Sequence, residues 1–205
     1  MANTRSRKFI RDEIERAKPW ERCDSVAFFS GSNKKDREWH VLAAVVNLLR
    51  SARKDAPTLA DESERPDFQT YKDNGELWAP VEILEILPPG YRRHKEYKER
   101  ANLKFRASWQ VFGSPLADPW QTLKEQIIRK ATKGYPSRTA LFVYYDIGRF
   151  SFRDKHTPFD EQILTTHSKH PFDGVTTFHR VLVVNSESNC LVELHPLAHV
   201  IVKEP

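Results

Sequence analysis

Residues Pro80–Pro88, PVEILEILP, form an apolar run that nevertheless contains two glutamates. Five of the seven residues between the prolines are Val, Ile or Leu, a composition typical of a β-strand that is buried on both faces. Because side chains alternate along a strand, Glu82 shares a face with Leu84 and Ile86, while Glu85 lies on the other face among apolar residues. Neither glutamate has a polar face of its own. A buried carboxylate without a partner costs several kcal/mol, so at least one of the two requires a partner elsewhere in the chain.

The residues before this run predict a β-hairpin. A strand at Pro66–Tyr71 is followed by Asn74-Gly75, the strongest short-range signal for a turn between two strands. The second strand then leads into the apolar run. Asp67 and Glu82 are therefore expected on neighbouring antiparallel strands, on either side of one turn.

Helices are predicted before and after this hairpin. From Lys34 to about Arg53 the chain has an apolar stripe of the helical period, and Glu38 lies on the same face as that stripe. A second helix is predicted from Pro119 to a stop at Gly134, with Leu123, Ile127 and Ala131 on its inner face. Further strands are expected at 139–146, 178–185 and 190–194. A short helix is expected at 5–17, and a polar connection at 55–65.

This order of elements predicts an α/β fold in which a mixed β-sheet is flanked by helices. With 205 residues, the chain has the length of one large domain. We divide it into an N-terminal extension (1–33), a core (34–146), an irregular loop (147–177) and C-terminal strands (178–205).

The composition is that of a soluble globular protein, with 39% hydrophobic and 30% charged residues. No apolar run is long enough to span a membrane, and the N-terminus lacks the apolar segment of a secretory signal. The two cysteines, Cys23 and Cys190, lie far apart and are expected to be reduced thiols. These features indicate a cytoplasmic protein with no membrane partner.

The positive charge is concentrated in one segment, residues 88–106. It has seven basic and two acidic residues, and therefore accounts for the whole net charge of +5. Aromatic residues alternate with these charges, a pattern typical of surfaces that contact phosphates and stack on bases. A solvated, charged helix surface is the alternative. The candidate nucleic-acid-binding residues are Arg92, Arg93, Lys95, Lys98, Arg100 and Lys104.

The arrangement of acidic residues resembles that of the PD-(D/E)XK, restriction-endonuclease-like nuclease superfamily, over residues 34–146. The resemblance rests on Glu38 in a helix, on Pro66-Asp67 at a first strand, and on Glu82 in the second strand. Within this superfamily, the chain resembles families of poorly characterised bacterial endonucleases. The chain departs from the motif at Leu84, which stands where the superfamily normally has a lysine.

In some members of the superfamily this lysine has moved to the next helix. Lys130 is our candidate, because the pattern Ile127-x-x-Lys130-x-x-Lys133 resembles that of such members. Lys124 is a rival, because the helical wheel turns it further inward. If neither lysine reaches the acidic residues, the site binds metal poorly or is inactive.

The resemblance implies Mg²⁺- or Mn²⁺-dependent hydrolysis of DNA, in phage defence or repair, with RNA as the alternative substrate. Asp67 and Glu82 would bind the metal, and Glu85 or the carbonyl of Ile83 would complete its ligands. Glu38 would hold a metal-bound water or a second ion. The lysine would orient the attacking water or neutralise the phosphate. A homodimer would allow both strands of a duplex to be cut.

Each of these acidic residues also has a structural interpretation. Asp67 is also suited to cap a strand end, and Glu82 to form a buried ion pair with Lys130. Glu38 would be a partly exposed first-turn residue favoured by the helix dipole, and Glu85 would pair with an arginine of the basic segment. The corresponding functions are a catalytically inactive nucleic-acid-binding protein with the same fold, or a protein-interaction module that binds an acidic partner.

Overall fold

A computed structural model describes residues 7–12, 34–86, 119–145, 159–172, 177–185 and 190–203. It has a mixed eight-stranded sheet in which the strands follow one another in sequence order, β1 to β8. Strands β4, β5 and β6 are parallel, and all other neighbours are antiparallel. The strands are β1 (Lys8–Phe9), β2 (Leu59–Glu62), β3 (Phe68–Tyr71), β4 (Leu77–Ile86), β5 (Ala140–Tyr145), β6 (Arg180–Asn185), β7 (Cys190–His195) and β8 (His199–Lys203). The helices include α3 (Lys34–Ser51), α5 (Pro119–Ala131) and α6 (Phe159–Lys169).

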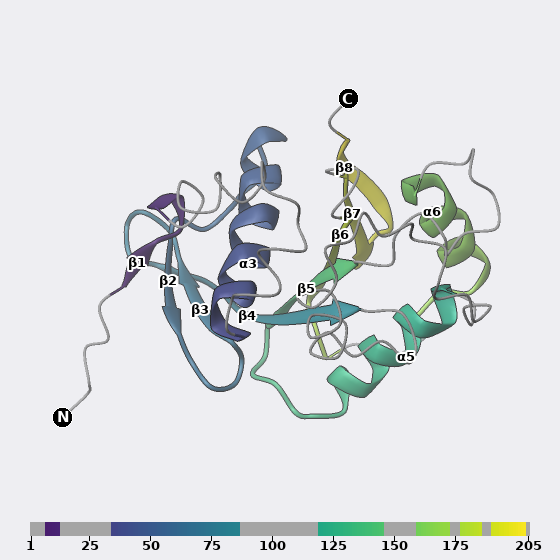
Figure 1. The fold of residues 1–205 in the computed structure, drawn as a ribbon, viewed down its shortest axis with the longest axis horizontal. Coiled ribbons are helices and arrows are strands. Elements are labelled where there is room, and N and C mark those ends of the chain that lie inside the picture. The colour runs from purple at the N-terminus through teal and green to yellow at the C-terminus, as the bar shows by residue number, and fades with distance from the viewer. Residues whose placement is uncertain are drawn as a thin grey trace, which may run out of the picture.

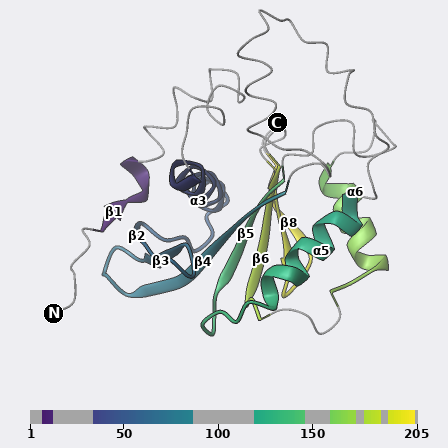
Figure 2. The same cartoon turned by 60° about the horizontal axis from the view of Figure 1, so that its bottom comes forward.

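The helices cover both faces of the sheet, so the fold has three layers (Figures 1 and 2). Helix α3 packs on one face with one apolar cluster, and α5 and α6 pack on the other face with a second cluster. The prediction of an α/β fold with a mixed, helix-flanked sheet is thereby confirmed. No helix in the described ranges has the length and apolar character that crossing a membrane requires.

The apolar stripe predicted for the first helix is the buried face of α3. All five of its residues are buried: Val41, Leu42, Val45, Leu48 and Leu49. At the start of the helix, the ring of Trp39 lies edge-on to Phe68 of β3, with the centroids 4.8 Å apart. This contact places the first turns of α3 directly beside the hairpin.

The hairpin forms at the predicted place. Gly75 adopts φ +80, and its N–H donates to the carbonyl of Lys72 at 2.9 Å, which closes the turn. Near the turn the register shifts by one residue: Tyr71 pairs with Leu77, but Thr70 pairs with Ala79. Beyond this shift, β4 is buried on both faces up to Ile86, as its sequence predicts.

Four segments differ from the prediction. Residues 8–9 of the expected extension form β1, and the expected polar connection contains β2, which pairs with both β1 and β3. The expected irregular loop, 147–177, contains α6. Helix α6 is rich in Thr, Ser and His, which are weak helix formers, and it is held by the packing of Ile163 in the cluster that contains Trp120 and Phe172. The short strand β8 was also not predicted.

Candidate functional site

Strand β3 ends before β4 does, so beyond Val81 strand β4 has no partner strand on its β3 side, while β5 still pairs with its other edge. Phe68 is the first residue of β3 and pairs with Val81, whereas β4 continues beyond this pair. On this unpaired edge of β4, the N–H group of Ile83 therefore needs an acceptor other than a neighbouring strand. The side chain of Asp67 supplies it, because Ile83 N donates to Asp67 Oδ2 at 2.9 Å. In the other direction, Asp67 N donates to Glu82 Oε2 at 3.2 Å. The two carboxylates are thus held together where the strands separate.

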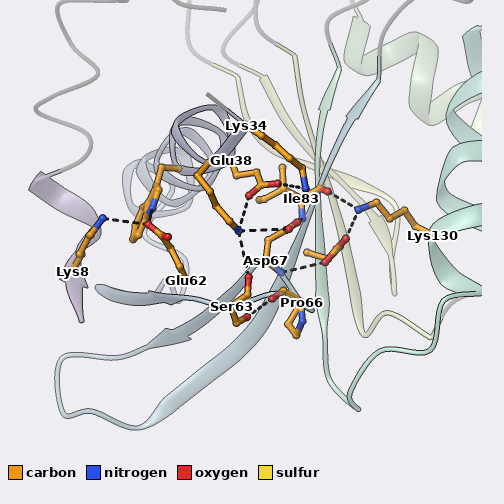
Figure 3. A network of polar contacts seen from close by, with 12 residues as sticks. Lys8, Lys34, Glu38, Glu62, Ser63, Pro66, Asp67, Ile83 and Lys130 are labelled. Carbon is orange, nitrogen blue, oxygen red and sulfur yellow. Dashed lines mark hydrogen bonds and ion pairs between the residues drawn. The ribbon is translucent and has the colours of Figure 1, made fainter. Parts of the chain in front are cut away.

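Glu82 is 5% exposed, and its partners answer the question raised by its apolar surroundings. Lys130 of α5 donates to Glu82 Oε1 and also to the carbonyl of Ile83, the latter at 3.0 Å. Tyr135 donates its hydroxyl to the same Oε1 at 3.0 Å. Glu82 therefore receives hydrogen bonds from the hairpin, through the Asp67 amide, and from two residues at the end of α5 and in the turn after it. Figure 3 shows Lys130 approaching this cluster from one side and Lys34 and Glu38 from the other.

The end of α5 places both Lys130 and Tyr135. Leu123, Ile127 and Ala131 bury the inner face of the helix, which leaves Lys130 on its flank beside β4. Gly134 follows the helix with φ +67, the left-handed conformation typical of a helix C-terminus. The chain then turns so that the ring of Tyr135 packs on Phe178 at 5.2 Å, with its hydroxyl directed to Glu82.

Glu38 reaches the same cluster from α3 and is also buried, at 5% exposure. Its carboxylate forms ion pairs with Lys34, at 2.9 Å from Oε1, and with Lys35, at 2.9 Å from Oε2. The Lys35 ammonium also lies 4.0 Å from Asp67 Oδ1, so it links the helix carboxylate to the hairpin carboxylate. Glu38 is therefore not the partly exposed residue of the structural alternative.

The electrostatics distinguish Asp67 from its neighbours. Burial raises the pKa of Asp67 to about 6. The N–H of Ile83 and the charge of Lys130 act in the opposite direction, but the charges of Glu82 and Glu38 raise this pKa further. For Glu38, burial acts to raise the pKa, but the hydrogen bonds from Lys35 and Lys34 outweigh it and hold this pKa below its usual value. Burial also raises the pKa of Tyr135, and the charge of Glu82 adds to this effect. Asp67 is thus the carboxylate with the least compensation.

The remaining predicted residues are not joined to the cluster by these contacts. Lys124 of α5 is close enough to His167 of α6 for its charge to lower the pKa of His167, an effect smaller than that of burial, which also lowers it. Glu85 is on the opposite face of β4 from Glu82, the face that packs with α3. The six candidate nucleic-acid-binding residues of segment 88–106 lie outside the described residues.

The donor set fits a hard divalent cation in its chemistry, because it consists of carboxylates and a nearby backbone carbonyl. No ready-made group of three or more His, Cys, Asp or Glu ligands occurs in the described part of the chain. In the structure, these carboxylates are paired with the ammonium groups of lysines. The Lys35 ammonium, between Glu38 and Asp67, marks the point at which the cluster attracts a cation. A divalent ion at this point requires Lys35 to move away, and its 38% exposed side chain is free to extend into solvent.

The sequence analysis missed three residues that contact the cluster. Lys34 and Lys35 had a signal, because two lysines in the first turn of a helix oppose the helix dipole and call for an acidic partner nearby. Tyr135 had none, since its position depends on the turn at Gly134 and on packing against Phe178. Leu84, at the usual lysine position of the nuclease motif, is buried in the apolar cluster with α5.

Comparisons of this chain with protein families, with curated proteins and with solved structures find no match.

Proposed function

We propose that the protein hydrolyses phosphodiester bonds of DNA in a Mg²⁺- or Mn²⁺-dependent reaction, with the acidic cluster as its active site. The observation that carries the proposal is the meeting of Glu38, Asp67 and Glu82, from three separate elements, with Lys130 bonded to Glu82. The order of helix, hairpin, helix and parallel strand also agrees with the arrangement expected for a restriction-endonuclease-like core.

Each residue has a defined task in this proposal. Asp67 and Glu82 would hold the metal, with Glu38 on the α3 side of the cluster. When bound, a divalent cation activates water and stabilises the charge that develops on the phosphate. Lys130 carries a fixed positive charge 3.0 Å from the Ile83 carbonyl, where it would orient the attacking water or neutralise a phosphate oxygen. Tyr135 limits the movement of Glu82 by donating to Oε1.

A catalytically inactive nucleic-acid-binding protein is the second candidate. The observation in its favour is Leu84, which is buried among apolar side chains and so removes the lysine of the usual motif. In this alternative the contacts of the cluster are structural, with Asp67 capping β4 and Lys130 neutralising Glu82. The two candidates differ in whether these residues are needed for cleavage.

The test is cleavage of supercoiled plasmid DNA with Mg²⁺, Mn²⁺ or EDTA. We expect Asp67→Asn and Glu82→Gln to abolish cleavage, and Lys130→Met to reduce its rate by about 10²–10³-fold, the usual cost of losing one preorganised charge. The matched control is Glu193→Gln, because Glu193 is another buried glutamate on a strand of the same sheet. It should cut at the wild-type rate at temperatures where it is folded. Metal-independent DNA binding without cleavage by the wild type would instead support the second candidate.

A further inference from the structure

Two lysines on the first turn of α3 share one buried carboxylate. Lys34 and Lys35 each lie 2.9 Å from a different oxygen of Glu38. Lys35 is also 4.0 Å from Asp67 and donates to the carbonyl of Ser63 at 3.3 Å. These lysines therefore neutralise negative charge on the α3 side of the acidic cluster, while Lys130 neutralises the charge of Glu82 on the α5 side.

Both lysines are unfavourably placed for the helix itself. The N-terminus of a helix carries a partial positive charge, and basic side chains in the first turn oppose it. Glu38, one turn further along α3, offsets this unfavourable placement. A local conflict of this kind is expected where a residue serves a function other than the stability of its own element.

The lysines and the carboxylates differ in their freedom to move. The side chains of Glu38 and Asp67 are each 6% exposed, and Asp67 is fixed further by the Ile83 amide. In contrast, the side chains of Lys34 and Lys35 are 76% and 38% exposed. The ammonium groups can leave for solvent, whereas the carboxylates must remain. The lysine side chains therefore have more room to move than the carboxylates that they neutralise, and a carboxylate that loses its lysine requires another cation.

We propose that Lys34 and Lys35 are built-in counterions that a divalent metal displaces from Glu38 and Asp67, and that they then contact the phosphates of the bound nucleic acid. This inference rests on the proposed metal site. It adds phosphate-contacting residues at the start of α3 to the candidates that the sequence offers in segment 88–106. It also links the two ligands, because metal binding frees the lysines that the nucleic acid requires.

The first test is Mn²⁺ binding by calorimetry to the protein without nucleic acid. Lys35→Met removes the competing charge, and we expect it to bind Mn²⁺ roughly 1.5- to fivefold more tightly, the range that corresponds to losing a partly exposed ion pair. Lys35→Gln is a second variant in case Lys35→Met does not fold. The matched control is Lys72→Met: Lys72 is 39% exposed and lies 3.9 Å from Asp55 in a different part of the protein. Its Mn²⁺ affinity should equal that of the wild type.

The outcomes separate this inference from the proposed function. If the wild type binds Mn²⁺ and both Lys35 variants bind it equally or more weakly, the exchange is overturned while the metal site stands. If only the Lys35 variants bind Mn²⁺, the lysine competes as proposed. If no variant binds Mn²⁺, the metal site fails, and the inference fails with it.

The second test is the salt dependence of binding to a fluorescent DNA duplex, with Mn²⁺ and with EDTA. In Mn²⁺, a lysine that contacts a phosphate contributes about one unit to the slope of log K against log salt, and Lys35→Met should lose that unit. In EDTA, the slopes of the wild type and of Lys35→Met should agree. An equal loss in both conditions would mean that Lys35 contacts DNA without any exchange, and no loss in either would mean that it does not contact DNA.

Discussion

Glu82 and Glu193 are both buried on strands of the same sheet, with 5% and 6% exposure, but they are neutralised in different ways. Glu193 on β7 has one main partner, Arg180 of β6, which donates to both oxygens at 2.7 and 3.1 Å. Glu82 has three donors from separate segments and lies close enough to Asp67 for their charges to repel.

The difference indicates two uses of a buried carboxylate. A bidentate arginine neutralises both oxygens of a carboxylate with a single side chain, and here only His199, 3.8 Å from Oε2, is also close among the described residues. In the cluster, by contrast, separate donors hold the acids in place, so one donor can be replaced by another ligand while the remaining donors stay bound. The Arg180–Glu193 pair has the form of a structural ion pair, whereas the cluster around Glu82 holds its carboxylates through several separate donors, as the proposed metal site requires.

The largest expected effect is on stability, when each glutamate loses its cation. Arg180→Met should lower the free energy of unfolding by about 3–5 kcal/mol, because Glu193 is left as an uncompensated buried charge. Lys130→Met should cost only about 1–2 kcal/mol, because Tyr135 and the Asp67 amide still donate to Glu82. Urea denaturation measures both values.

The control for this pair is the double variant Arg180→Met with Glu193→Leu. It removes both charges and should regain most of the lost stability. An equal loss for Lys130→Met and Arg180→Met would mean that Glu82 depends on one partner as Glu193 does. It would then support the structural interpretation of the cluster.

A smaller effect is expected from Asp67→Asn, and it has the opposite sign. The pKa of Asp67 is raised to about 6, so folding favours its protonated form, and stability is lost as the pH rises from about 4 through 6. An asparagine still accepts the Ile83 N–H and carries no charge. Without metal, Asp67→Asn should therefore be more stable than the wild type by about 3 kcal/mol at pH 8, and equal to it near pH 4.

Thermal unfolding at pH 4, 6 and 8 in EDTA measures this difference. Glu193→Gln is the control, and it should be destabilised at pH 8 because it loses a charge-assisted pair with Arg180. A destabilised Asp67→Asn at pH 8 would show that the carboxylate is well compensated, contrary to the cluster described above.

The smallest effect is expected for Tyr135→Phe. The substitution removes one of the three donors to Glu82 and should cost about 1 kcal/mol of unfolding free energy. Tyr71→Phe is the control, because the ring of Tyr71 lies under Arg7 at 3.9 Å, away from the cluster, and its loss of a hydroxyl should change stability by less than about 0.5 kcal/mol. Guanidinium denaturation can resolve the two. Equal values for both variants would remove Tyr135 from the set of residues that hold Glu82.

The strongly periodic parts of the fold were predictable from the sequence. The apolar stripe of α3, the Asn74-Gly75 turn and the run in β4 each give a local signal that tertiary structure does not reverse. The segments that were missed have no such signal. Strand β2 contains Asp61 and Glu62, and β1 has two residues, so both depend on pairing rather than on their own composition.

The site was predictable in part, for the same reason. The inward faces of α3 and β4 were enough to indicate Glu38 and Glu82, and the turn brought Asp67 beside Glu82. A helical wheel gives the direction of a side chain but not how the helix lies on the sheet. The wheel turns Lys124 further inward, but the resemblance to the nuclease pattern made Lys130 the candidate, and Lys130 is the lysine that contacts Glu82. The membership in the nuclease superfamily stays a prediction.

The register shift in the hairpin has a consequence for the acidic cluster. Without it, the pairing of Tyr71 with Leu77 would continue so that Phe68 faced Pro80, and Asp67 would come opposite Val81. The extra residue on β4 moves Asp67 forward to the level of Glu82. A single inserted residue, Trp78, which lies outside the acidic cluster and donates to Asp55, thus sets the spacing of the two acids. An engineered hairpin that lacked this irregularity would separate Asp67 from Glu82 without any substitution in the cluster itself.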